Sequence, residues 1–261
     1  MIETVDRRIL GAFVCVDAIT GSSVVPAIPV TSAQWNVKAN RSGTYVIFDG
    51  PGFDALTTQF VPSGTWPAAP TQYEVTLQDS NLRYLPRRAM VSAPAAVPAI
   101  PPVSATPTGV FAPQQVTVFP SPAAAVGPNW ATIRVSVTQA GTTPPRGLPY
   151  AIVQVINTDG SAVLATGQTD SNGEALLAVI GPTLQPNPQG GGDVTVSTVS
   201  ATATAYFLPR NLTQPSGWIP NPDDILNDLT NTALVTSSSP VTFSSGQDQS
   251  LNLALTLPPT P

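Results

Sequence analysis

Apolar and polar residues alternate with a period of two along much of this chain. The pattern is clearest at 131–137, where Ile133, Val135 and Val137 are separated by polar residues. Because successive side chains of a β-strand point to opposite faces, this spacing predicts a strand with one buried face. Further strands of this kind are predicted at 44–48, 73–77, 151–156, 174–179 and 250–257.

Turn signals separate the predicted strands at short intervals. Asn40-Arg41-Ser42-Gly43 precedes one strand, and Asp170-Ser171-Asn172-Gly173 precedes another. Asn, Asp and Gly tolerate the backbone conformations that tight turns need. Many short strands joined by such turns are typical of an all-β sandwich.

Proline supports this fold class and also divides the chain. The 261 residues include 30 prolines and 19 glycines, which argue against long helices. One short helix is predicted near 222–229, where acidic residues occupy the first turn. We therefore predict a first immunoglobulin-like sandwich at 1–88, a proline-rich extended linker or strap at 89–115, and a second sandwich at 116–261.

The two halves resemble distant copies of each other. The strand ending at 14–18 matches 135–140, and the turn and strand at 42–46 match 172–176. A third match aligns Tyr73–Leu77 with Leu251–Leu255.

The chemistry of the side chains argues against an enzyme. The chain has no histidine and one cysteine, Cys15, which lies in an apolar run and is expected in the core. No phosphate-binding loop, nucleophile elbow or His/Cys metal spacing is present, so we predict no cofactor and no metal. The acidic cluster of Asp223, Asp224 and Asp228 lacks the glycine-containing loop of a calcium site and is interpreted as a solvated helix start.

The distribution of charge limits the partners. Only 10% of residues are charged, and the formal net charge is −5, with no basic stripe that could neutralise phosphates. No segment approaches the roughly 20 apolar residues of a membrane span, and no secretion signal is found at the N-terminus. We predict no nucleic acid partner, no membrane insertion and synthesis in the cytoplasm.

A few residues are candidates for a protein interface. Trp66 and Trp218 lie among prolines in predicted loops, and Arg87 and Arg88 close the first domain, where they could dock an acidic neighbour. If the proline-rich segment is a strap on a neighbouring subunit, its apolar anchors are Ile100, Val103 and Phe111.

Two resemblances extend this picture. The segment Thr169-Asp170-Ser171-Asn172-Gly173-Glu174-Ala175 resembles the hairpin of carboxypeptidase-regulatory-like, transthyretin-like sandwiches. That resemblance implies a transthyretin-like second domain with a scaffolding role. The segments 83–88 (Arg-Tyr-Leu-Pro-Arg-Arg) and 119–130 are similar to two-module proteins that accompany phage-tail-like contractile injection systems.

The second resemblance implies a non-enzymatic structural component of such a particle, at its baseplate, cap or surface. Its partners would be other protein subunits of the assembly or further copies of this chain. Two alternatives stay open: a glycan- or receptor-binding module at a particle tip, and an accessory domain of an enzyme complex.

Overall fold

The computed structural model describes residues 9–51, 70–93, 113–127, 130–179, 185–186, 194–195, 198–244 and 246–258. The described chain is all-β, as the alternating pattern predicted. Its helical segments are η2 (Pro209–Thr213) and the four-residue helix α2 (Asp223–Leu226), which lies inside the predicted range 222–229. None of the described helices has the length and apolar character needed to cross a membrane.

The chain divides into two compact units. The first contains Met1–Asp17, Ser22–Ser80 and Pro86–Val118, and the second contains Ala18–Gly21, Asn81–Leu85 and Phe119–Pro261.

The first unit is built from two sheets, one ordered β3-β4-β1-β7 and the other β2-β5-β6. Its strands are β1 (Gly11–Asp17), β2 (Val30–Thr31), β3 (Asn36–Ala39), β4 (Thr44–Asp49), β5 (Thr71–Leu77), β6 (Arg87–Ala93) and β7 (Gln114–Val118). Phe13 of β1 stacks on Tyr45 of β4 with ring centroids 4.5 Å apart. Both rings are fully buried, and the Tyr45 hydroxyl donates to the carbonyl of Ile28 at 2.7 Å. This sheet therefore buries a stacked aromatic pair, and the buried Tyr45 hydroxyl is hydrogen-bonded.

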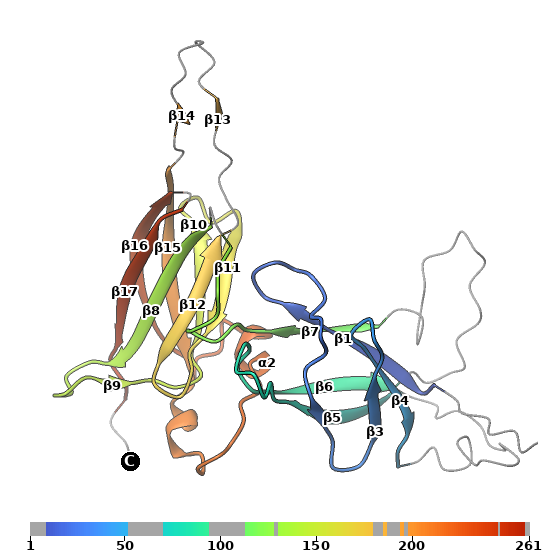
Figure 1. Cartoon of the computed structure of the whole chain (residues 1–261). Coiled ribbons are helices and arrows are strands. Elements are labelled where there is room, and N and C mark those ends of the chain that lie inside the picture. Colours follow the sequence, from blue (N-terminus) through green and yellow to red (C-terminus); the bar gives the residue numbers. More distant parts are fainter. Residues whose placement is uncertain are drawn as a thin grey trace, which may run out of the picture. The chain divides into compact units, whose positions relative to one another are not determined.

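The second unit is a sandwich of two sheets that lie face to face (Figure 1), one ordered β11-β10-β15-β16 and the other β12-β8-β17 with β9 beside β8. Its strands are β8 (Ala131–Gln139), β9 (Arg146–Gly147), β10 (Ile152–Asn157), β11 (Val163–Gln168), β12 (Glu174–Val179), β15 (Thr198–Phe207), β16 (Val235–Ser244) and β17 (Asp248–Leu255), with a separate pair β13 (Gln185–Pro186) and β14 (Val194–Thr195). Ile133 and Val135 of one sheet and Val153 and Phe207 of the other belong to a single buried cluster. Burial of these alternating side chains holds the two sheets together.

The ends of the predicted linker are strands of the first unit. β6 pairs with β5 over residues 87–93, and β7 pairs in parallel with β1, so that Cys15 faces Val116. The predicted boundaries at 88 and 116 therefore differ from the observed units, while residues 94–112 lie outside the described part of the chain. The proline-rich composition concealed both strands, of which β6 pairs with its sequence neighbour β5 and β7 pairs with the distant β1.

The two units share one arrangement of strands. β4 and β7 flank β1 in the first unit, one antiparallel and one parallel, as β12 and β17 flank β8 in the second. The first two predicted matches between the halves are thus confirmed. The third is wrong, because Tyr73–Leu77 lies in the opposite sheet and corresponds to β15, whereas Leu251–Leu255 corresponds to β7.

The turns before β4 and β12 are also equivalent. The Oδ1 atom of Asn40 accepts from the backbone N–H groups of Ser42 and Thr44, each at 2.9 Å. The Oδ1 atom of Asp170 accepts from Asn172 at 2.8 Å and from Glu174 at 3.0 Å. Gly43 and Gly173 follow with φ values of 82° and 84°, which a glycine adopts without strain.

Candidate functional site

The predicted interface residues fall in different places. Trp66, Ile100, Val103 and Phe111 lie outside the described residues, so the structure does not bear on them. Arg87, Arg88 and Trp218 are described, and the first two belong to the first unit while Trp218 belongs to the second.

Arg87 is buried, so the prediction that it lies on the surface of the first domain is wrong. Its side chain is only 1% exposed, its Nε donates to the carbonyl of Arg88 at 3.2 Å, and its guanidinium also donates to the carbonyl of Thr117. A buried guanidinium needs several acceptors to offset its lost hydration. Within β6, Arg87 shares the inward face with Ala89, Val91 and Ala93, so the period of two was the signal that could have placed it inside.

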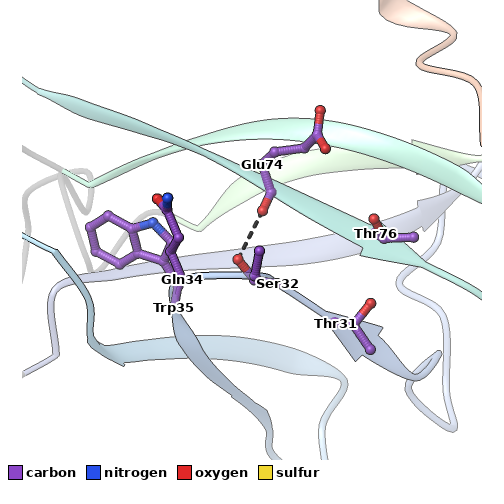
Figure 2. A pocket seen from close by; sticks show the side chains of 7 residues that line it. Thr31, Ser32, Gln34, Trp35, Glu74 and Thr76 are labelled. Atoms are coloured by element: carbon purple, nitrogen blue, oxygen red, sulfur yellow. Dashed lines mark hydrogen bonds between the residues drawn. The ribbon is translucent and has the colours of Figure 1, made fainter.

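Arg88, on the opposite face of β6, lies beside a surface groove. Its guanidinium forms an ion pair with the carboxylate of Glu74 at 3.2 Å. The groove has a volume of about 550 Å³ and is lined by Thr31, Ser32, Ala33, Gln34, Trp35, Glu74 and Thr76. Figure 2 shows these side chains, with the Ser32 hydroxyl donating to the backbone carbonyl of Glu74 at 2.9 Å.

Trp35 lines this groove, and its neighbours hold its ring in place. It is only 8% exposed, and its ring lies 4.7 Å from that of Tyr73. A Cβ atom on Gly50 would lie 2.0 Å from the Trp35 ring, so only glycine fits beneath the indole. The groove joins a fixed aromatic edge to hydroxyl and carboxylate groups, which suits a polar or extended ligand.

A second pocket lies in the second unit and contains Trp218. Its volume is about 410 Å³, and its lining includes Arg146, Tyr150, Asn211, Gln214 and Trp218. The rings of Tyr150 and Trp218 meet edge to face, with centroids 5.7 Å apart and planes at 65°. Burial, followed by the negative charge of Asp170, raises the pKa of Tyr150, which keeps its hydroxyl protonated as a hydrogen-bond donor.

Parts of the two motifs of the second resemblance, residues 83–85 and 119–121, lie together. Leu85 donates its N–H to the carbonyl of Phe119 at 2.8 Å, and Ser121 donates to the carbonyl of Arg83 at 2.8 Å. Tyr84 and Pro120 form an antiparallel bridge between these bonds. Phe119 is 1% exposed and packs in a small cluster with Ile152, Leu208 and Ile225. Segments that are separate in the sequence thus form one local structure in the second unit.

The reactive groups are dispersed. Burial raises the pKa of Cys15 to about 11, so the thiol is protonated and enclosed. Asp224 of the predicted acidic cluster pairs with Arg210 at 3.0 Å. Within the described ranges, no group of three or more His, Cys, Asp or Glu side chains could hold a metal ion.

Comparisons with known proteins add only distant similarities. No protein-family model matches the chain, and no curated protein matches it. Among solved structures, the chain is similar to GBS52, a minor pilin of Streptococcus agalactiae, with 10% identity over 86% of this chain and 68% of the pilin, at a TM-score of 0.28. It is also similar to the Bacillus anthracis TIE protein, with 10% identity over 95% of this chain and 34% of that protein, at a TM-score of 0.25. A leucine-rich repeat protein of Bacteroides thetaiotaomicron matches with 12% identity over 94% of this chain and 26% of its own length, at a TM-score of 0.22.

Proposed function

We propose that this chain is a non-catalytic structural subunit of a large protein particle, and that the particle is of the phage-tail-like contractile injection kind. It would act through packing against other subunits or further copies of itself, at a baseplate, cap or surface. After synthesis in the cytoplasm it would reside in the assembled particle.

The observation that carries this proposal is the pairing of the two motif segments. Residues 83–85 and 119–121 are joined by backbone hydrogen bonds, and Phe119 anchors them in a buried cluster. Parts of the two sequence motifs that carry the resemblance therefore lie side by side in the second unit, while Arg87 and Arg88 of the first motif belong to the first unit. A surface with few ionisable groups supports the same reading, because interfaces are depleted in charged side chains.

We assign both units to the immunoglobulin-like and transthyretin-like class of sandwiches. The shared order of strands around β1 and β8 supports this assignment, as does the Asx turn at Asp170 within the hairpin motif. Modules of this class serve widely as rigid building blocks, so the fold is compatible with the role but does not define it.

The test is sedimentation of a native lysate, followed by mass spectrometry of the heavy fraction. The proposal expects this chain there at a fixed ratio to sheath, tube and baseplate proteins. Recovery only in the light fraction would refute the particle role, and copurification with a catalytic subunit would instead favour an accessory domain of an enzyme complex.

A charge variant tests whether the groove beside Arg88 contributes to packing. Arg88→Ala removes the guanidinium of the Arg88–Glu74 pair, and Arg210→Ala makes the same change at the Arg210–Asp224 pair. If Arg88 docks a neighbour, Arg88→Ala lowers the amount of chain in the particle fraction, while Arg210→Ala leaves it unchanged. Equal incorporation of both variants would exclude Arg88 as a docking residue.

A further inference from the structure

The second unit has a long connection where the first has a short one. β5 and β6 are joined by residues 78–86, whereas the corresponding strands β15 and β16 are joined by residues 208–234. Because the shorter connection already suffices in the first unit, the longer one is not needed to join this pair of strands. Its residues 211, 212 and 214–218 form a wall of the pocket that contains Tyr150. Loops added to a rigid sandwich are a common location for binding sites.

The opposite side of this pocket is held in an unusual backbone conformation. Tyr150 has a φ of 61°, which is uncommon for a bulky side chain. Its N–H donates to the carbonyl of Thr169 at 3.2 Å, and its ring meets Trp218 edge to face. Such a conformation persists only where the surrounding structure maintains it, and it occurs often at binding sites.

Asn211 supplies a polar side chain to the lining of this pocket. The residue is 9% exposed, and its backbone N–H donates to the carbonyl of Leu208 at 2.9 Å. Asn211 is among the residues that line the pocket, and no described residue makes a hydrogen bond to its side-chain amide. The Asn211 amide is not among the fully enclosed side-chain groups that lack a partner, so it is open to solvent, and a polar group that enters the pocket can hydrogen-bond to it in place of water.

We propose that this pocket binds a carbohydrate, with the C–H face of a pyranose ring against the Tyr150–Trp218 pair and neighbouring hydroxyls on the Asn211 amide. Aromatic side chains offer apolar faces for such a ring. An amide both donates and accepts, as does each sugar hydroxyl. The volume of about 410 Å³ lies at the small end of ligand pockets and suits one or two sugar rings.

A proline-rich peptide is the competing ligand for an aromatic pocket. Its proline residues have no N–H to donate, so they would leave the Asn211 carbonyl oxygen without a partner. The chemistry of Asn211 therefore favours the sugar. This inference does not rest on the particle role and can hold or fail separately from it.

The test uses the purified full-length chain on an array of oligosaccharides of glucose, galactose, mannose and N-acetylglucosamine. We expect at least one glycan to bind, and titration with that glycan to shift the indole N–H resonance of Trp218. Trp218→Ala and Asn211→Leu should each weaken binding by about tenfold or more. Arg210→Ala, in the same connection but outside the pocket lining, should bind like the unaltered chain.

Thermal melting identifies variants that have lost their fold. The Trp218 resonance is measured in the unaltered chain, so it reports glycan binding without any effect of a substitution on folding. The proposal is overturned if no glycan binds, or if glycan binding leaves that resonance in place. It is also overturned if a polyproline peptide shifts the resonance and the sugars do not.

Discussion

Gly173 is a position at which a single added methyl group should damage the second unit in two separate ways. Its φ of 84° is a conformation that costs an L-residue about 1–2 kcal/mol. A Cβ atom there would lie 2.6 Å from both the N–H nitrogen of Leu148 and the carbonyl oxygen of Val137. These are backbone atoms that cannot rotate away, so overpacking adds about 1–3 kcal/mol. We expect Gly173→Ala to lower the free energy of unfolding by about 2–5 kcal/mol.

Gly160 provides the matched control within the same unit. Its φ is 72°, but a Cβ atom there would meet nothing within 4 Å. Gly160→Ala therefore carries only the conformational cost of about 1–2 kcal/mol. The gain from restricting the unfolded chain is common to both variants and cancels in their comparison.

Calorimetry measures the difference in Tm between Gly173→Ala and Gly160→Ala directly. A domain of this size class shifts its Tm by about 2–4 °C for each kcal/mol, so Gly173→Ala should melt at least about 2 °C below Gly160→Ala. In the first unit Gly43→Ala should behave like Gly173→Ala, because its Cβ would lie 2.7 Å from the carbonyl oxygen of Val24. Equal melting temperatures for Gly173→Ala and Gly160→Ala would refute the reasoning from backbone contact.

Three further predictions follow from the buried and turn-forming polar groups. Arg87→Met should lower the free energy of unfolding of the first unit by about 3 kcal/mol or more in urea titrations, because it leaves buried carbonyl oxygens without a donor. Arg88→Met should lower it by no more than about 1 kcal/mol. Similar losses for the two variants would contradict the observed burial of Arg87. The Cys15 thiol should resist a maleimide at pH 8 until the protein unfolds. Since its folded pKa is raised to about 11, its contribution to stability is complete below the unfolded pKa and declines as pH rises toward 11; rapid labelling of the folded chain would refute its burial. Asp170→Asn should retain stability within about 0.5 kcal/mol, since Asn40 makes the same turn, while Asp170→Ala should lose about 1–3 kcal/mol; thermal melting of both variants decides.

The fold class and several local elements follow from the sequence alone. The alternation at 131–137 predicts β8 because the period of two reports which face of a strand is buried. The side-chain oxygens of Asn40 and Asp170, each three residues before a glycine, predict the two turns because their hydrogen bonds are local.

The tertiary structure alone decides which strands pair and which side chains meet. β7 joins β1 across about a hundred residues, and no local pattern near Val116 identifies Cys15 as its partner. The same holds for the pocket, since Tyr150 and Trp218 are brought together by a connection that winds back from β15. Local periodicity determines the face of the strand on which a residue lies, but non-local packing determines which residues it contacts. A binding site consists of residues that such packing brings together from distant parts of the sequence.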